Sequence, residues 1–179
     1  MKRNNDFEKR KIYKASTNKV VTNVYMDAFG IEKVRFQNAS YEDKTSIDIY
    51  LDFAKLTLLA EDVRSGRIFK QLENDKITVT MGGSKSSENY NGQPESRIMS
   101  LGRKDDKIFI NMTCGLGKLG STGLIIPDGQ PDKRISVGMT IDDFRTMILY
   151  TDKCVSAYLS YYIPDLVYQF EEERKNFNN

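Results

Sequence analysis

The chain has 179 residues, of which 29% are charged and 39% hydrophobic, as expected for a soluble globular protein of one domain or two very short ones. Its formal net charge is only +2, so a strongly basic protein is excluded. Histidine is absent, which removes the commonest general base, the commonest metal ligand and every Ser-His or Cys-His nucleophile pair. We therefore expect no enzyme, no cofactor and no metal site.

Cysteine content and hydropathy further limit the class of protein and its expected compartment. Cys114 and Cys154 are too few for a disulfide framework, and we expect small buried thiols in a reducing cytoplasm. No apolar run approaches the roughly 18 residues of a membrane span, and the polar beginning of the sequence predicts no secretory signal. Residues 1–14 are rich in Lys and Arg and predict a flexible arm that contacts phosphates or is simply solvated.

Alternating apolar residues predict strands in the first half of the chain. Two candidate strands, around residues 20–25 and 34–36, are separated by Phe29-Gly30, and a third covers residues 47–51. At Asp52 the spacing of apolar residues changes to three and four. This spacing predicts a helix from an Asp52 N-cap toward residue 72, with a weak point at Gly66.

The second half repeats this order of elements. Strands are predicted around residues 77–81, 98–101, 108–112, 124–126 and 135–139, with a polar loop before Pro94 and a hairpin turn at 103–107. Thr140 and Asp143 then resemble a capping box at the start of a long amphipathic helix. We expect Pro164 to end this helix, and residues 166–179 to form a separate polar helix or tail.

The two junctions between strand and helix align without gaps. Residues 47–59 and 135–147 carry apolar residues at matching positions, and each strand enters its helix with almost no loop. The sequence therefore predicts an α+β fold of two tandem antiparallel sheet-plus-helix units. One domain, residues 15–165, would contain pseudo-repeats at about 15–74 and 75–165.

Two patterns that suggest enzyme chemistry are better explained structurally. Residues 115–120 match the dinucleotide-binding glycine pattern, but a strand-like segment ending at Pro127 follows where a helix is required. We interpret the glycines as a flexible loop in which Lys118 is available to a phosphate. The acidic clusters lie in a turn, at a helix start and in an exposed run, and none predicts a metal site.

Basic and aromatic residues mixed along strands favour single-stranded nucleic acid as the ligand, because cations meet the backbone while rings stack on bases. Further tyrosines, at positions 13, 25, 41, 50 and 90, add rings that need not all belong to the core. The predicted nucleic-acid-binding residues are Lys33, Arg35, Phe36, Arg97, Arg103, Lys104, Lys107, Phe109, Lys118, Lys133 and Arg134.

Around the second junction the sequence resembles the transcriptional positive-coactivator family. The resemblance rests on Lys133-Arg134-Ile135-Ser136-Val137 followed by Thr140-Ile141-Asp142-Asp143-Phe144. With the first unit added, the chain resembles the plant Whirly arrangement, although the Lys-Gly-Lys-Ala-Ala-Leu motif and tryptophan are both absent. The resemblance implies two sheets packed crosswise, single-stranded DNA bound along strand faces and edges, and a homo-oligomer. We expect the long C-terminal helix, around Val155 to Tyr162, to lie at or near the interface of this oligomer.

The sequence thus predicts a largely sequence-independent single-stranded DNA-binding protein that acts in replication, repair or transfer of a mobile genetic element. Three alternatives stay open: a protein–protein adaptor or structural protein, an RNA-binding module using the same surface, and, less favoured, an enzyme.

Overall fold

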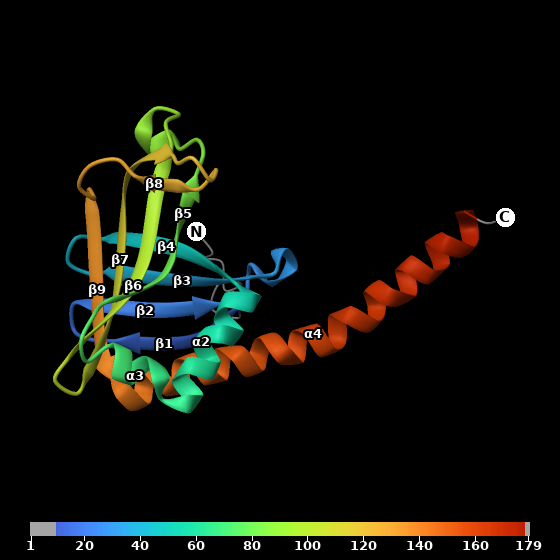
Figure 1. The fold of residues 1–179 in the computed structure, drawn as a ribbon, viewed down its shortest axis with the longest axis horizontal. Helices are drawn as coiled ribbons and strands as arrows, with labels where there is room; N and C mark the ends of the chain where they lie inside the picture. Colours follow the sequence, from blue (N-terminus) through green and yellow to red (C-terminus); the bar gives the residue numbers. More distant parts are fainter. Residues whose placement is uncertain (1–9, 178–179) are drawn as a thin grey trace, which may run out of the picture.

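The protein consists of two antiparallel sheets that cross each other, and its longer helices begin at one end of the body (Figure 1). The computed structural model describes residues 10–177. The first sheet has the order β1-β2-β3-β4, and the second has β5-β6-β7-β8 with β9 also paired to β7. The strands are β1 (Lys11–Ser16), β2 (Val20–Tyr25), β3 (Lys33–Ser40), β4 (Thr45–Asp52), β5 (Ile77–Ser84), β6 (Glu95–Lys104), β7 (Lys107–Leu119), β8 (Ile125–Pro127) and β9 (Lys133–Thr140). The helices are η1 (Phe29–Ile31), α2 (Phe53–Ser65), α3 (Arg67–Gln71), η2 (Glu88–Tyr90) and α4 (Ile141–Phe177).

Each sheet is a meander whose last strand continues directly into a helix. β4 enters α2 at Asp52 and β9 enters α4 at Thr140, as the aligned junctions predict. The units differ in one respect, because the second inserts the short strand β8 between β7 and β9. The predicted class, α+β with two antiparallel sheets, is confirmed.

One continuous core joins the two units. The inward residues of both sheets pack against the apolar sides of α2 and α4, so that Phe36, Leu56, Ile110, Val137 and Phe144 belong to the same buried cluster. Full burial of side chains of this size contributes about 1.5–3 kcal/mol each. The free energy of folding is therefore shared between the units.

The first helix is interrupted where the sequence indicates a weak point. Gly66 has φ 77°, a left-handed conformation that costs glycine least, and it separates α2 from α3. Asp52 occupies the N-cap position but makes no side-chain cap bond. Its carboxylate lies 3.5 Å from the Lys33 ammonium instead.

Part of the predicted N-terminal arm is a strand. Lys11 and Lys14 lie in β1, whose partner is β2, so they are not part of a flexible segment. Residues 1–9 of that arm lie outside the described residues.

The glycine-rich run does not form a loop, contrary to our expectation, because β7 extends to Leu119. A Cβ at Gly117 would lie 2.7 Å from Ile125 Cγ2 and 2.9 Å from the Ser96 backbone nitrogen, and one at Gly115 would lie 2.9 Å from Pro131 Cα. The glycines therefore allow β6, β8 and the following loop to approach β7 closely.

Pro164 does not end the last helix, so the expected break is wrong. α4 continues as one helix of 37 residues, about 55 Å long at about 1.5 Å per residue, and its second half projects away from the sheets (Figure 1). Proline removes one backbone donor from the helix, a loss that water can compensate where the helix is exposed. In the described part of the chain, no helix is both long and apolar enough to cross a membrane.

The start of α4 has the predicted capping geometry. The backbone N–H of Asp143 donates to Thr140 Oγ1 at 3.1 Å, and the Thr140 hydroxyl donates to Asp143 Oδ2 at 2.7 Å. The two acids in the first turn also face the positive end of the helix dipole. This geometry gives Thr140, Asp142 and Asp143 a structural role.

Replacing the cap should destabilise the protein by a predictable amount. Thr140→Ala removes the hydroxyl that caps the Asp143 N–H and should lower the free energy of unfolding by about 1 kcal/mol. Thr140→Ser keeps the hydroxyl and serves as the control. Urea unfolding followed by circular dichroism measures both; equal losses in the two variants would show that the cap bond is not the cause.

Candidate nucleic-acid interface

The second sheet has one side that faces away from the core, and alternation along its strands defines the residues on it. We call this side the outer face. Its positions are Thr78 and Met81 on β5, Ile98, Ser100, Gly102 and Lys104 on β6, Lys107, Phe109, Asn111 and Thr113 on β7, and Arg134, Ser136 and Gly138 on β9. Small and hydroxylated residues dominate, and none of these positions carries an acid.

The aromatic ring of Phe109 packs directly over a glycine of the neighbouring strand on this face. Phe109 and Gly138 are paired across β7 and β9, and a Cβ on Gly138 would lie 2.8 Å from Phe109 Cε1. The half-buried ring borders an open groove of about 620 Å³ between the sheet and the β1–β2 turn, with Lys19 and Lys107 on its sides. A ring held in this way can stack on a planar ligand.

The cations of the outer face are exposed. Lys104, Lys107 and Arg134 have no ion-pair partner within residues 10–177. Lys133 is exposed as well, but by alternation it belongs to the other side of β9. The structure thus brings Lys104, Lys107, Phe109 and Arg134 onto one surface.

Two predicted binding residues are buried, and for them the prediction is wrong. Phe36 is 1% exposed and packs in the core. Arg35 is 6% exposed, lies over the Tyr25 ring at 4.0 Å, and pairs with Asp27 at 2.6 Å and Asp48 at 2.9 Å. Burial disfavours its charge, but these two acids outweigh burial and raise the pKa of Arg35. Neither side chain can meet a ligand in this fold.

Two more predicted cations have structural partners. Arg103 donates to the Phe69 carbonyl at 3.4 Å and lies 3.2 Å from Glu73, so it attaches the β6–β7 hairpin to the segment around α3. Lys118 pairs with Asp128 at 2.9 Å. The Lys118 pair is exposed and contributes little energy, so this lysine can exchange its partner, whereas Arg103 is held by three groups, the third being the Asp105 carbonyl at 3.1 Å.

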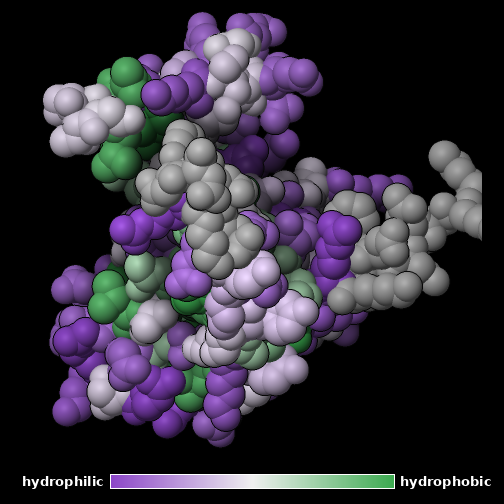
Figure 2. All heavy atoms as spheres, turned by 90° about the vertical axis from the view of Figure 1, so that its right-hand side faces the viewer, coloured by the Kyte–Doolittle hydropathy of each residue, from purple (hydrophilic) through white to green (hydrophobic). Residues whose placement is uncertain are grey.

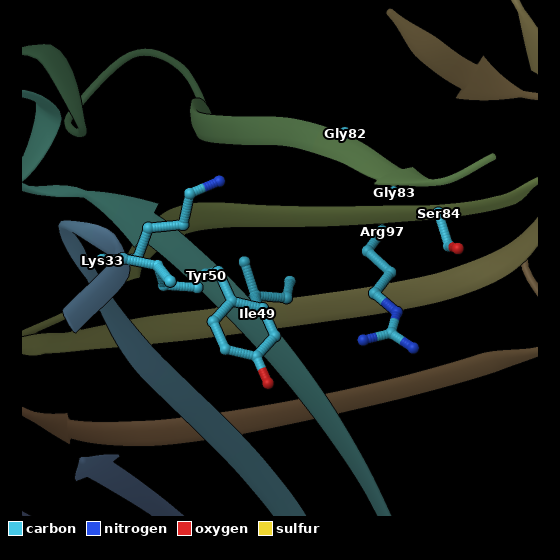
Figure 3. Close-up of a pocket in the computed structure, with 8 residues that line it drawn as sticks. Lys33, Ile49, Tyr50, Gly82, Gly83, Ser84 and Arg97 are labelled. Atoms are coloured by element: carbon cyan, nitrogen blue, oxygen red, sulfur yellow. The ribbon is translucent and has the colours of Figure 1, made fainter. Parts of the chain in front are cut away.

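Lys33 and Arg97 both line a separate cleft between the two sheets. The cleft has a volume of about 360 Å³, and Tyr50, Ile31 and the backbone of Gly82 also line it. Figure 3 shows Lys33 and Tyr50 entering from the first sheet and Arg97 from the second. β4 and β5 are the terminal strands of their sheets, so the cleft lies where two sheet edges meet.

Arg97 is fixed before any ligand arrives. Its Nε donates to Glu95 at 2.9 Å and its Nη1 to the Asp48 carbonyl at 3.1 Å, which joins the second sheet to the first. Burial alone would raise the pKa of Glu95, but hydrogen bonds from Arg97 and Ser87 outweigh burial and lower it. The pKa of Arg97 is raised, because the bond to Glu95 outweighs the cost of burial.

This ion pair, in which Glu95 is buried and Arg97 half-buried, should make stability depend on pH. Because the pKa of Glu95 is lowered on folding, its contribution is complete above its ordinary value of 4.5 and is lost as pH falls below that value. Glu95→Gln should therefore destabilise the protein at neutral pH, and the difference from wild type should shrink in acid.

The exposed partner of Arg103 provides the control for this experiment. Glu73→Gln removes an ion pair in which the carboxylate is 60% exposed and should change stability little at any pH. Chemical unfolding at a series of pH values measures both variants. A Glu95→Gln deficit that stays constant into acid would contradict the role of its charge.

No group of acids and cysteines suited to a metal ion occurs among the described residues. Cys114 is buried and Cys154 half-buried, both are free thiols, and burial raises the pKa of each. This result agrees with our interpretation of both as small core residues. No known protein-family model matches the chain, and no curated protein matches it significantly.

Sequence reasoning missed the cleft. Tyr50 is one of several tyrosines in the sequence with no distinguishing pattern around it, and Ile31 and the two glycines of β5 carry no sequence signal for binding. Alternation indicates that Tyr50 lies on the solvent side of β4, where it is 44% exposed. No sequence pattern indicates that β5 lies beside it.

Proposed function

We propose that the protein binds single-stranded DNA across the outer face of its second sheet. The observation that carries this proposal is an acid-free face with a supported ring, Phe109, and unpaired cations, Lys107 and Arg134, at different strands. Single-strand binders combine these groups: cations contact the backbone, and rings stack on bases without sequence preference. The small residues between them leave room for bases to approach the sheet.

The two meander-and-helix units support the further proposal that this is a Whirly-like arrangement. In a Whirly-like arrangement the helices cover one end of the core, and the outer side of one sheet stays exposed. We also propose the cytoplasm as the compartment, because a reducing environment maintains free thiols such as Cys114 and Cys154.

The ring should account for a measurable share of affinity. Phe109→Ala should weaken binding to an oligothymidylate by about 1–3 kcal/mol, the contribution of one base–ring stack. Gly138→Ala keeps the ring but displaces it, since the new Cβ would lie 2.8 Å from Phe109 Cε1, and should weaken binding too. Fluorescence anisotropy measures affinity, and a thermal melt verifies folding. Unchanged affinity in both folded variants would contradict the proposal.

The cations should determine the salt dependence. The double variant Lys107→Gln with Arg134→Gln should flatten the slope of log affinity against log salt by about 0.7 for each phosphate that the protein no longer neutralises. Lys55→Gln with Lys70→Gln removes the same charge from exposed helix positions and is the control. Equal slopes in the two double variants would show that the change comes from net charge alone and would contradict a specific role for Lys107 and Arg134. Parallel titrations with RNA and duplex DNA decide between single-stranded DNA and the RNA alternative.

The projecting half of α4 supports a second proposal, that the protein forms a homo-oligomer through this helix. Tyr161, Ile163, Val167, Tyr168 and Phe170 are each 50–79% exposed. Figure 2 shows that on the side toward which α4 projects hydrophilic residues dominate and apolar ones form small separate groups. Most helical stability in proteins comes from packing of an apolar side, and these exposed side chains have no such packing in the described part of the chain, so they favour a partner.

The interface lies further along the helix than the sequence suggests. We expected it around Val155–Tyr162, but Val155 is 1% exposed and Tyr158 packs edge-on against Phe29 and Phe53. Ile163, Val167 and Phe170 follow spacings of four and three, which places them on one side of the helix.

Substitution on that side should separate the subunits. Ile163→Lys with Phe170→Lys should convert the oligomer to a monomer while the body stays folded, because two charges would be buried in the interface. Leu58→Lys, at an isolated exposed leucine of α2, is the control. Light scattering at micromolar concentration measures the mass. A monomeric wild type would refute the assembly while leaving DNA binding to its own test.

A further inference from the structure

We propose that the cleft between β4 and β5 is a nucleotide-binding pocket, in which a base stacks on Tyr50 and the phosphate meets Lys33 and Arg97. The pocket would add a contact to the proposed single-strand binding site. This inference rests on the proposed function where the nucleotide belongs to a bound strand, and is independent of it where the nucleotide is free. Its volume of about 360 Å³ lies within the range of about 300–1,000 Å³ typical of small-ligand sites.

The aromatic side of the pocket is exposed and has an apolar neighbour. Tyr50 is 44% and Ile31 64% exposed, although both are large apolar side chains next to a concave surface. A planar base can cover both. Such coverage would remove apolar surface from water without any change in the fold.

The two cations that line the pocket, Arg97 and Lys33, are each ready to receive an anion. Arg97 uses its Nε and Nη1 for Glu95 and the Asp48 carbonyl, and a guanidinium has five N–H donors, so donors remain for a phosphate. Glu95 is 4% exposed and sits behind Arg97, which shields its charge from a ligand. Within residues 10–177, the ion-pair partner of Lys33 is Asp52, in an exposed pair that a phosphate can replace.

The third side is bare backbone, which leaves the pocket open. A Cβ on Gly82 meets nothing within 4 Å, so a side chain there would enter the cleft without displacing the protein. Gly83 is different, because its Cβ would lie only 1.8 Å from the Glu95 carbonyl oxygen. Gly82 therefore offers a position at which the pocket can be filled while the fold is kept.

The pocket lies at the end of a path across the outer face. Cross-strand pairing places Arg134, Thr113, Ile98 and Met81 in one row from β9 to β5, about 14 Å at about 4.8 Å per strand. Gly82 follows Met81 and borders the cleft. A strand that crosses the sheet along this row leaves it at β5, where Tyr50 and Arg97 can hold its next nucleotide.

Two variants test the pocket, one by removing the ring and one by filling the space. Tyr50→Ala and Gly82→Val should each weaken oligothymidylate binding at least about fivefold, the lower end of what one stacked base contributes. Tyr41→Ala removes a tyrosine that is 50% exposed in the β3–β4 turn and should leave affinity unchanged. Circular dichroism and a thermal melt verify that each variant is folded.

Titration with deoxythymidine monophosphate distinguishes the two sources of the nucleotide. Binding of the free nucleotide that disappears in Tyr50→Ala supports the pocket even if wild type binds no oligothymidylate, in which case the proposed function alone is wrong. A loss of binding confined to the oligothymidylate supports a pocket for a nucleotide within a strand. One result would support binding on the outer face and overturn the pocket: Phe109→Ala weakens oligothymidylate binding, while Tyr50→Ala and Gly82→Val leave the affinity for both ligands unchanged.

Discussion

The crossing of the two sheets depends on one buried amide. Asn38, on the inner side of β3, donates to the carbonyl oxygens of Ile110 on β7 and Ile135 on β9, at 2.9 and 3.2 Å, and accepts from the Thr22 hydroxyl at 2.6 Å. Asn38 and Thr22 are fully buried. A slide of one sheet over the other would leave these polar groups unpaired, at about 1–3 kcal/mol for each. Apolar packing alone is not directional, so this network fixes the register of the crossing.

The crossing decides which surfaces are available to a ligand. Because the first sheet and the helices occupy the inner side of the second sheet, its outer side stays open (Figure 1). The same geometry leaves a cleft between the edge strands β4 and β5, lined by Tyr50 and Gly82. Arg97 then spans the gap to the Asp48 carbonyl. Both candidate surfaces are thus consequences of how the units cross, and neither unit would form the cleft alone.

Local patterns predict most of the elements, although not β1 or the extension of β7 to Leu119, whereas contacts between distant residues are not predictable from them. The strand-to-helix junctions, the Thr140 cap and the Gly66 break depend on neighbouring residues, and each is found where the sequence places it. Whether a cation is free depends on acids elsewhere in the chain, as Arg35 shows with Asp27 and Asp48. The outcome at Pro164 also depends on distant parts of the chain, because only the tertiary structure shows that its part of α4 lies exposed, away from the sheets.

A net charge of +2 therefore describes the interface poorly. Many acids are used where a basic side chain needs a partner, as with Glu73 for Arg103 and Asp128 for Lys118, and the outer face is left without acids. A protein with little overall charge attracts a polyanion weakly at long range, since screening removes such fields beyond about 10 Å at about 0.1 M salt. Affinity must then come from a few short-range contacts, and a supported ring beside free cations provides contacts of that kind.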